Sequence, residues 1–433
     1  MNERRVVITG CGVVSPLGLS ASSTWEALLR GESGIRPITY FDASTFPTRI
    51  AGEAKNFDFS KIWADLGSDY LLPSTVSQTT RLAVVAAHEA WRDSGLSESN
   101  VPSERMGVYL GAGKGEAVND IQFIGSIFRR CLDDQGAFSI PQFVNAALES
   151  LEQGRELEVD PGRAAYHIAR MLGLSGPNST CLTACAAGAQ ALGEAYRQVR
   201  ENVADVVIGG GCHSMITPQG IIGFNLLGAL STDNEDPRRA SRPFDATRNG
   251  FVLAEGAAMV VLEEYEHAKR RRASILAELA GYGCTADAFR VTDPNPDAAG
   301  EAEAIVRALK DAGVNPDDVD YINAHGTSTI SNDQTETKAI KRTFGDRAYK
   351  IPVSSTKSLT GHLIAAAGAL EAIVCAYAIN NGVVPGTHNY SEIDEECDLD
   401  YIPNDTREVR VDVALSNSFG FGGQNTALVI RRV

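Results

Sequence analysis

The sequence lacks the features of a secreted, membrane-spanning or nucleic-acid-binding protein. Its eight cysteines are scattered and do not form the spacing pattern of a disulfide framework. No run of about 18 apolar residues is present, and no signal-peptide-like segment precedes the first predicted strand. Basic residues are outnumbered, with 39 Lys and Arg against 55 Asp and Glu, and the net charge of −16 argues against a nucleic-acid-binding face. We therefore expect a reduced, cytoplasmic protein that binds neither membrane nor nucleic acid.

Metal and nucleotide motifs are also incomplete. Cys181 and Cys185 lie in one segment, but no second cysteine pair or neighbouring histidine completes a zinc set. Gly10 to Gly12 follow an apolar stretch, yet Ser15 stands where a dinucleotide-binding loop needs its third glycine. Gly111 to Gly115 has a glycine after its lysine, where a phosphate-binding loop needs Ser or Thr. We expect no metal and no nucleotide cofactor.

Strand-like and helix-like stretches alternate along the whole chain. Its 433 residues, 43% of them apolar, suffice for two domains or one large duplicated domain. The predicted strands are 5–9, 107–111, 205–209, 257–263, 319–324, 351–355, 411–415 and 426–430. The clearest predicted helices are 22–29, 79–94, 161–172, 186 onward, 301–312 and 360–379. The pattern is typical of an α/β fold with a largely buried sheet.

Cys185 lies at a predicted corner between a strand and a helix. Thr180 to Thr183 is predicted as the end of a buried strand, and the Ala-rich stretch from Ala186 as a helix. The free N–H groups and the positive dipole end of a helix favour a thiolate over a thiol. A small buried hydrophobe is the alternative role for such a cysteine. Taken alone, the segment therefore leaves both roles open.

A second corner resembles the first. TACAAGAQALGEA at 183–195 and TGHLIAAAGALEA at 360–372 share four of thirteen positions when aligned without gaps, which pairs Cys185 with His362. A duplicated α/β domain would bring two such corners together across a pseudo-twofold axis. His325 ends another apolar strand, and the segment from Phe419 to Gly423 is rich in glycine. The sequence therefore predicts that these four segments meet at one site.

Four motifs in this order resemble those of the β-ketoacyl-acyl carrier protein synthases, most closely the synthase II type. The motifs are Thr183-Ala184-Cys185-x-x-Gly188, His325-Gly326-Thr327-Ser328-Thr329, Lys357-Ser358-Leu359-Thr360-Gly361-His362 and Asn417-Ser418-Phe419-Gly420-Phe421-Gly422-Gly423. The resemblance runs from Arg5 to the C-terminus and includes RPFDATRNGFV at 242–252. It implies the thiolase fold, an α/β fold in which two duplicated βαβαβαββ halves form a five-layered αβαβα core. The expected halves are 1–265, with the cysteine, and 266–433, with both histidines.

The resemblance also implies a reaction and its catalytic residues. Cys185 takes an acyl group from a carrier-protein thioester, and the backbone N–H groups of Cys185 and Phe421 form the oxyanion hole. Neutral His325 and His362 stabilise the enolate that forms when malonyl-acyl carrier protein loses carbon dioxide. Attack of the enolate on the acyl-cysteine gives a β-ketoacyl product, as in fatty-acid or polyketide elongation. The implied partners are acyl carrier protein, whose phosphopantetheine carries the substrates, and a second copy of the chain in a homodimer.

Supporting residues follow from the same resemblance. Lys357 and Glu336 match a pair that holds the histidines in place, because a buried lysine needs a partner. Thr327 and Thr329 match residues that meet the pantetheine arm, and simple turn chemistry is their alternative role. The remaining matches are aromatic: Phe421 gates the acyl pocket, Phe224 lines it or packs in the core, and Phe419 borders the substrate.

Two departures from the family pattern bear on the substrate. Lys114 falls where the synthase II type has an apolar residue near the pocket floor, so an inward-pointing ammonium favours a short or polar acyl chain unless Glu116 pairs with it. About twenty residues between Arg129 and Asp160 exceed the expected pattern and would reshape the pocket mouth or the dimer edge. Arg129, Arg130 and the basic run 269–272 are the candidates for contact with an acidic carrier protein.

Four other functions are weighed against this one. An inactive chain-length factor typically lacks the cysteine, and a thiolase needs a second cysteine near the C-terminal glycine loop, where this chain has none. An NADPH-dependent reductase conflicts with the incomplete glycine motifs. A structural docking module would tolerate Cys185→Ala. The sequence leaves the acyl chain, the pathway and the carrier-protein surface open.

Overall fold

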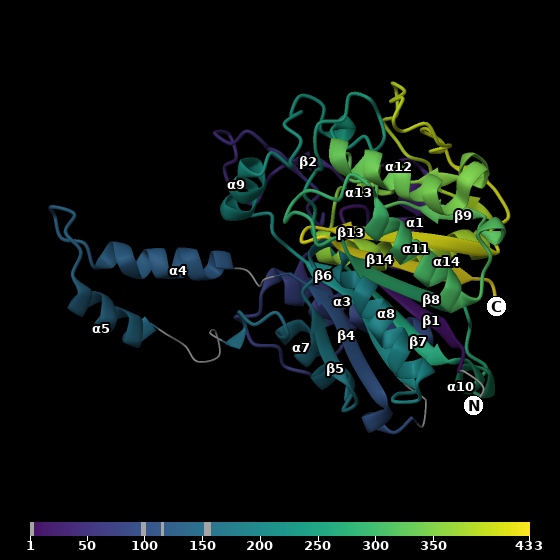
Figure 1. Ribbon diagram of the computed structural model, residues 1–433. Helices are drawn as coiled ribbons and strands as arrows, with labels where there is room; N and C mark the ends of the chain where they lie inside the picture. The colour runs from purple at the N-terminus through teal and green to yellow at the C-terminus, as the bar shows by residue number, and fades with distance from the viewer. Residues whose placement is uncertain (1–3, 97–100, 114–116, 151–156) are drawn as a thin grey trace.

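The computed structural model describes residues 4–96, 101–113, 117–150 and 157–433. Ten strands form one continuous hydrogen-bonded series (Figure 1). The N-terminal half contributes β1 (Val6–Val14), β4 (Met106–Ala112), β5 (Asn178–Cys181), β6 (Val206–His213) and β7 (Gly256–Glu264). The C-terminal half contributes β8 (Ala277–Ala286), β9 (Tyr321–Asn323), β10 (Val353–Ser354), β13 (Val413–Gly420) and β14 (Gln424–Arg431).

The strand order shows that the fold is duplicated. The series runs β10-β9-β13-β14-β8-β1-β7-β6-β4-β5. Each half, with its strands numbered in chain order, has the order 3-2-4-5-1, and the two first strands meet where Val7 pairs with Glu278. The fifth strand of each half runs antiparallel to its neighbours. The two βαβαβαββ halves are the thiolase-type duplication that the resemblance implies.

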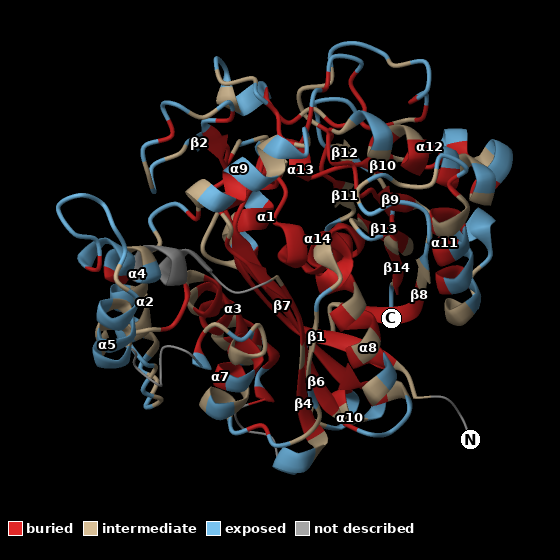
Figure 2. Cartoon of the chain, turned by 60° about the vertical axis from the view of Figure 1, so that its left-hand side comes forward, coloured by how far each residue is buried: buried red, intermediate tan, exposed pale blue. Residues whose placement is uncertain are grey.

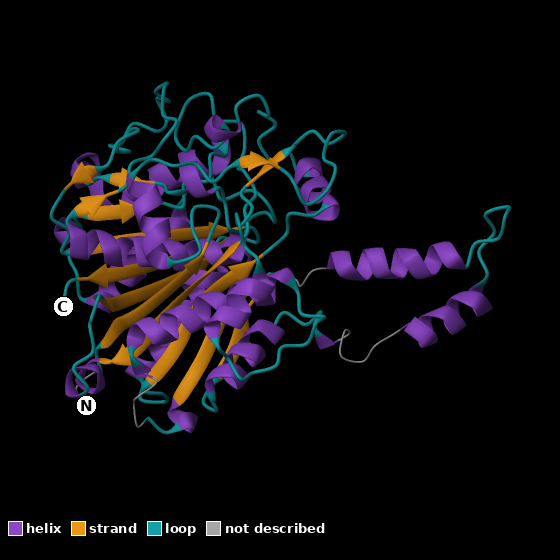
Figure 3. Ribbon diagram, turned by 180° about the vertical axis from the view of Figure 1, so that it is seen from behind, coloured by secondary structure: helices purple, strands orange, loops and turns teal. Residues whose placement is uncertain are grey.

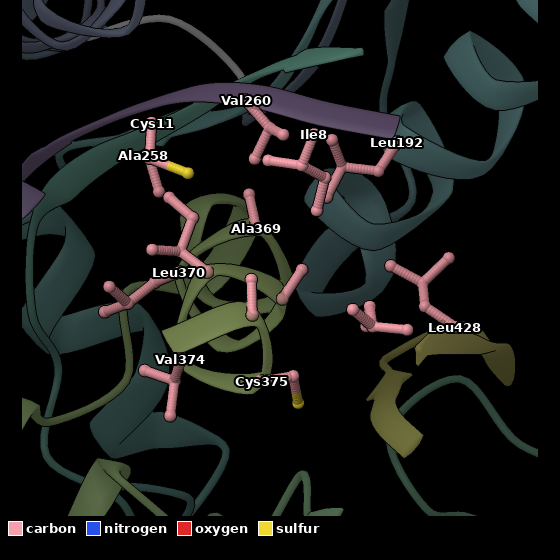
Figure 4. Close-up of a cluster of buried hydrophobic side chains, with 14 of the residues drawn as sticks. Ile8, Cys11, Leu192, Ala258, Val260, Ala369, Leu370, Val374, Cys375 and Leu428 are labelled. Carbon is pink, nitrogen blue, oxygen red and sulfur yellow. The ribbon is translucent and has the colours of Figure 1, made fainter. Parts of the chain in front are cut away.

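Helices complete five layers. α3 (Gln78–Ser94) and α7 (Arg163–Leu172) cover the outer face of the first half, and α11 (Ala299–Ala312) and α12 (Ile330–Phe344) that of the second. α8 (Ala187–Arg200) and α14 (Ala367–Asn381) form the middle layer. Figure 2 shows these middle elements as buried, and Figure 4 shows side chains of β1, β7, β14, α8 and α14 in one apolar cluster. Residues of both halves therefore share one core.

The smaller elements lie around this core. They are α1 (Ala21–Leu29), α2 (Phe59–Leu66), α4 (Ala117–Arg130), α5 (Ile140–Ser150), α9 (Pro218–Leu226), α10 (Tyr265–Arg270), α13 (Lys357–Thr360) and the short pairs β2–β3 (Arg36–Pro37 and Ile50–Ala51) and β11–β12 (Val383–Val384 and Arg407–Glu408). α4 and α5 form a hairpin that projects from the body (Figures 1 and 3). This hairpin occupies most of the segment that the sequence marks as additional.

Glycines inside strands serve close packing here. A Cβ on Gly10 would lie 2.2 Å from the Ala90 carbonyl oxygen, and one on Gly12 would lie 2.0 Å from that of Ala86. α3 therefore packs directly on the β1 backbone at the motif that imitates a dinucleotide loop. The glycines at 209–211 likewise lie within β6 and do not end it, which corrects the predicted strand end at 209.

Several boundaries differ from the predictions. β5 ends at Cys181 and is partly exposed, because it is the last strand of the sheet; the predicted buried strand end at Thr183 is wrong. β8 is missing from the predicted strands, although all ten of its residues pair in the sheet or lie beside pairs. β13 continues through Gly420, so part of the glycine-rich segment is strand.

One helical segment of the described residues is long and apolar enough to cross a membrane by length and composition alone. Ile364 to Asn381 has a mean hydropathy of 1.4 over 18 residues. It is 83% buried, since α14 is the helix sandwiched between the two halves. A central core helix meets the same criterion because it is apolar on all sides.

Candidate active site

Cys185 lies on a one-turn 3-10 helix, Ala184–Ala186, directly before α8. Ala184 has a φ of 49°, in the left-handed region that a residue with a Cβ rarely adopts. This turn directs the chain from the edge of the sheet into the middle layer. The predicted corner is therefore present, although a two-residue linker separates it from β5.

One cavity of about 490 Å³ contains the reacting groups. Its wall includes Cys185, His325 and His362 together with Phe224, Thr327, Thr329, Phe419 and Phe421. The Cys185 sulfur and one ring nitrogen of each histidine all lie within 4.8 Å of one another. The two imidazole rings are 5.3 Å apart and nearly perpendicular. The structure thus brings together residues from three distant motifs.

The Cys185 thiol is neutral in the substrate-free cavity. Burial raises its pKa to about 11, whereas Lys357 and the backbone N–H groups of Phe421 and Cys185 lower it. The N–H groups at the helix start do favour the thiolate, as predicted, but burial has the larger effect and the net shift of the pKa is upward. Desolvation of the sulfur outweighs the nearby positive groups.

Both histidines are neutral at physiological pH. Burial, followed by the charge of Lys357, lowers the pKa of His325 and of His362 well below the usual value. The backbone N–H of Ile364 donates to Nδ1 of His362 at 3.3 Å, so the ring proton of His362 is on Nε2. That Nε2 is buried and has no hydrogen-bond partner among the described residues. It is therefore a free donor inside the cavity.

The glycine-rich loop approaches the Cys185 corner closely. A Cβ on Gly420 would lie 3.1 Å from the backbone nitrogens of both Cys185 and Ala186. The N–H groups of Phe421 and Cys185 act on the same sulfur, as their effect on its pKa shows. Both N–H groups therefore lie near the Cys185 sulfur.

The predicted Lys357–Glu336 pair is wrong. Lys357 is buried and pairs with Glu371 of α14. Glu336 accepts the backbone N–H groups of His325 at 2.8 Å and Gly326 at 2.7 Å. Both glutamates are buried, but Glu336 accepts backbone N–H groups whereas Glu371 binds the Lys357 ammonium. Glu336 thus orients the His325 loop, and Glu371 neutralises the lysine that lies near both histidines.

The predicted substrate-contacting residues line the cavity as well. The hydroxyls of Thr327 and Thr329 lie 2.9 Å apart, and Asp333 accepts the N–H of Thr327 at 3.1 Å. The Phe224 ring lies 6.5 Å from that of Phe421 on the wall next to Cys185. Lys114 and Glu116 lie outside the described residues.

Glu301 is a cavity residue that the sequence analysis did not identify. It opens α11 and is 1% exposed, and neither carboxylate oxygen has a hydrogen-bond partner among the described residues. Burial and the nearby Asp287 and Glu336 raise its pKa to about 7. On the sequence it is indistinguishable from any acidic residue in a first helical turn, where it complements the helix dipole.

Comparison with known proteins identifies the family. The model of the β-ketoacyl synthase N-terminal domain matches residues 3–268, and that of the C-terminal domain matches 276–391. The chain is a member of the β-ketoacyl synthase family. It is 46% identical to 3-oxoacyl-[acyl-carrier-protein] synthase 2 of Coxiella burnetii over the full length of both proteins.

Solved structures of ketosynthases also match this chain. A type II polyketide synthase acyl-carrier protein in complex with its ketosynthase, bound to the hexaketide, matches with a TM-score of 0.89 and 34% identity over 100% of both chains. The ishigamide ketosynthase/chain length factor matches with a TM-score of 0.87 and 33% identity, also over 100% of both chains. The synthase is thus similar both to fatty-acid enzymes and to polyketide ketosynthases.

Proposed function

We propose that this synthase carries out the decarboxylative condensation of an enzyme-bound acyl group with malonyl-acyl carrier protein. The observation that carries the proposal is the grouping of one thiol and two neutral imidazoles within 4.8 Å, with two backbone N–H groups near the sulfur. Such a site supplies a nucleophile, an oxyanion hole and hydrogen-bond donors for an enolate.

The first half-reaction transfers the acyl group. The Cys185 sulfur attacks the thioester carbonyl, and the N–H groups of Cys185 and Phe421 bind the oxygen as it gains negative charge. The bond from the carbonyl carbon to the carrier sulfur breaks, and the proton of the Cys185 thiol ends on that departing sulfur. The products are an acyl-cysteine and a free carrier thiol.

The second half-reaction forms the carbon–carbon bond. Malonyl-acyl carrier protein places its thioester oxygen near His325 and His362, and Nε2–H of His362 donates to that oxygen. Carbon dioxide leaves, and the resulting enolate attacks the acyl carbon of the acyl-cysteine. The bond to the Cys185 sulfur breaks, and one proton from solvent restores its thiol. Neutral histidines suit this role, because a charged ring would favour the malonyl carboxylate that must depart.

We propose that the reaction needs no metal, although a thiol and two imidazoles at this spacing resemble a metal-ligand set. A bound metal would occupy the sulfur that must attack and the imidazole donors that the enolate needs. Elemental analysis of the purified synthase should find less than one equivalent of zinc, and a chelator should leave turnover unchanged. A stoichiometric metal whose removal abolishes condensation would contradict this.

We propose acyl carrier protein and a second copy of the chain as partners. Among the described residues β5 is the last strand of the sheet, and Leu182 beside it is 59% exposed, which suits pairing with a second copy. Arg129 and Arg130 on α4 stay candidates for carrier contact. The basic run 269–272 does not, because α10 lies beside the N-terminus, far from the cavity elements (Figure 1), and Arg271 pairs with the buried Glu263.

Intact mass spectrometry tests the function directly. The synthase is incubated with carrier proteins that bear acyl chains of different length and polarity, and the mass added at Cys185 is measured. An adduct that disappears in Cys185→Ala and persists in Cys181→Ala is the expected result, and its chain preference separates fatty-acid from polyketide substrates. Absence of any adduct, with NADPH retained on the purified protein, would favour a reductase instead.

A further inference from the structure

The wall of the reaction cavity has an apolar part and a polar part. Phe224, Phe251 and Ile364 lie on the apolar part and belong to the same apolar cluster as Cys185. The polar part includes three acidic side chains, those of Asp287, Asp293 and Glu301. Because an enclosed carboxyl group is costly without a partner, the partners of these three groups indicate what each one does.

Two of the three carboxyl groups have partners within the chain. Asp287 accepts the side-chain N–H of Asn425 at 2.5 Å and the backbone N–H of Asn295 at 3.2 Å. Asp293 accepts a guanidinium N–H of Arg290 at 3.2 Å. These contacts are sufficient to explain both aspartates as structural residues of the cavity wall.

Glu301 has no such partner among the described residues. Its side chain is 1% exposed, and neither carboxyl oxygen accepts a hydrogen bond there. Burial raises the pKa of this group, and its own backbone N–H lowers it. Arg248, the one arginine or lysine on the described cavity wall, pairs with Asp333 and Asp394. A buried polar group without a partner is rare in folded proteins and calls for a ligand to complete its hydrogen bonds.

The backbone around Glu301 is held in place, so the side chain alone can turn. The Thr285 hydroxyl donates to the carbonyl oxygen of Gly300 at 2.6 Å, and a Cβ on Gly300 would lie 2.1 Å from Oδ1 of Asp287. The backbone N–H of Asp287 in turn donates to the carbonyl oxygen of Gly423 at 2.9 Å. Glu301 therefore has a fixed position beside the glycine-rich segment, with a carboxyl group that no hydrogen bond to another described residue restrains.

The substrate that crosses this cavity supplies the missing donor. A carrier protein is too large for a cavity of about 490 Å³, so its thioester must reach Cys185 on the phosphopantetheine arm. The arm contains two amide groups, and each amide N–H loses its water partner as the arm enters. An N–H group that is buried without an acceptor weakens binding. The two oxygens of Glu301 are unoccupied acceptors on the wall along which the arm passes.

We propose that Glu301 binds the phosphopantetheine arm by accepting one of its amide N–H groups. The inference rests on the proposed function, because that function brings the arm into the cavity, and it adds a specificity-determining residue. The bond satisfies both partners, since the carboxyl group gains a donor that the fold does not supply and the N–H gains an acceptor in place of water. A carboxyl group accepts in either protonation state, because each state has an oxygen without a proton.

The kinetics of Cys185 acylation test this contact. A pantetheine thioester of the acyl chain that modifies Cys185 best is compared with two analogues, each with one amide N–H replaced by an ester oxygen. In the wild type, one analogue should lower kcat/KM about tenfold, the effect of one hydrogen bond. Glu301→Ala should lower kcat/KM about tenfold with the parent thioester and should no longer distinguish that analogue. Glu301→Gln, whose amide oxygen still accepts, should restore the distinction.

The exposed Glu303→Ala, in the same helix, is the matched control and should behave as the wild type. Glu301→Leu fills the same volume without an acceptor and should repeat the result of Glu301→Ala if that variant folds poorly. Variants at 301 that still distinguish the analogue as the wild type does, or a wild type that distinguishes neither analogue, would overturn the contact and leave the reaction intact. A wild type whose Cys185 takes no acyl group from any carrier protein or pantetheine thioester would overturn the proposed function as well.

Discussion

Two corners face each other in the middle layer of this synthase. Ala184 has a φ of 49° and is followed by Cys185 and α8; Ile364 has the same φ and is followed by Ala365 and α14. Each corner is a three-residue 3-10 turn that continues into a helix. The equivalent of Cys185 is therefore Ala365, and the ungapped alignment that pairs Cys185 with His362 is displaced by three residues.

The two helices that follow these corners, α8 and α14, contact each other through equivalent residues. Both begin Ala-Gly-Ala, at 187–189 and 367–369. A Cβ on Gly188 would lie 2.5 Å from the Ala365 carbonyl oxygen, and one on Gly368 would lie 2.7 Å from Cβ of Ala189. The pseudo-twofold axis therefore passes through a close glycine-mediated crossing, which holds the two corners at a fixed separation.

The polar groups break this symmetry. Where α14 has Glu371, the equivalent position of α8 has Ala191, so only the second corner carries the buried pair with Lys357. The first corner supplies the nucleophile and the second supplies Nε2–H of His362 and the charge of Lys357. Duplication thus provides two similar frameworks, and a few substitutions give them complementary chemistry.

The largest expected effect comes from the first corner. Cys185→Ala should abolish acylation and lower condensation by about 10⁴-fold or more, because no other thiol lines the described cavity. Cys185→Ala combined with Ala365→Cys should stay inactive, since Ala365 is fully buried in the crossing. Intact mass and product formation measure both. Acylation at residue 365 would show that the corners are chemically interchangeable.

The histidines should affect only the second half-reaction. His362→Ala and His325→Ala should each lower condensation by about a hundredfold or more while Cys185 is still acylated. His88→Ala on α3, half-buried and outside the cavity, is the control. Since burial holds the pKa of both catalytic histidines well below 6.5, condensation should not decline as the pH falls through 6.5. An equal loss of acylation would contradict this division of roles.

The buried Lys357–Glu371 pair, which the first corner lacks, should contribute strongly to the free energy of unfolding. Lys357→Ala leaves Glu371 buried and unpaired, which should lower the free energy of unfolding by about 3–5 kcal/mol. The double variant Lys357→Met, Glu371→Leu should recover most of it. Lys341→Ala, which breaks a partly exposed pair with Asp398, should cost less than about 1 kcal/mol. Urea unfolding measures all three, and equal losses would show that burial of the pair is unimportant.

Glu89 and Glu301 lie on the corresponding helices α3 and α11 and respond differently to pH. Burial raises the pKa of each to about 7, but Glu89 accepts the N–H groups of Val13 and Ala21. A carboxyl with a raised native pKa makes the fold less stable as the pH rises from about 4.5 to 7. Glu301→Gln removes this decline. At pH 8 its free energy of unfolding should exceed that of the wild type by up to about 3 kcal/mol, and at pH 5 the two values should match.

The exposed Glu303→Gln serves as the control for Glu301→Gln. Glu89→Gln should instead destabilise by about 1 kcal/mol at pH 5, because one accepting oxygen is lost. Denaturant titrations at both pH values give the comparison. A Glu301→Gln variant that is no more stable than the wild type at pH 8 would mean that its carboxylate finds a partner in solution.

The last prediction tests the crossing of α8 and α14. Gly188→Ala should destabilise by about 2 kcal/mol, because its methyl group meets a backbone oxygen. Gly368→Ala meets the Ser418 hydroxyl, which can rotate, and the Cβ of Ala189, which its backbone holds in place, so it should destabilise by a similar amount. Gly223→Ala, in α9 with nothing within 4 Å, should be neutral or slightly stabilising. Thermal unfolding ranks the three, and a neutral Gly188→Ala would argue against the close crossing.

Some features of the site follow from local pattern. His325 and the Phe419–Gly423 segment follow or end an apolar strand, Cys185 follows the edge strand β5, and strand ends of an α/β sheet gather at one edge. The sequence alone therefore predicts the α/β class, the duplicated halves and the group of residues at the site. The middle layer is also predictable, because an Ala- and Gly-rich helix suits close packing.

Only the tertiary structure decided the finer relations. Two buried glutamates were available to Lys357, and the turn between α13 and α14 brings Glu371, not Glu336, to the ammonium. The correct alignment of the two corners is the one that pairs Ala184 with Ile364, because both residues have a φ of 49°. A count of identical residues does not contain this information. The resting state of Cys185 depends on how completely the fold excludes water from its sulfur. Sequence thus determined which groups are present, while packing determined their partners and protonation, because both depend on contacts between distant segments.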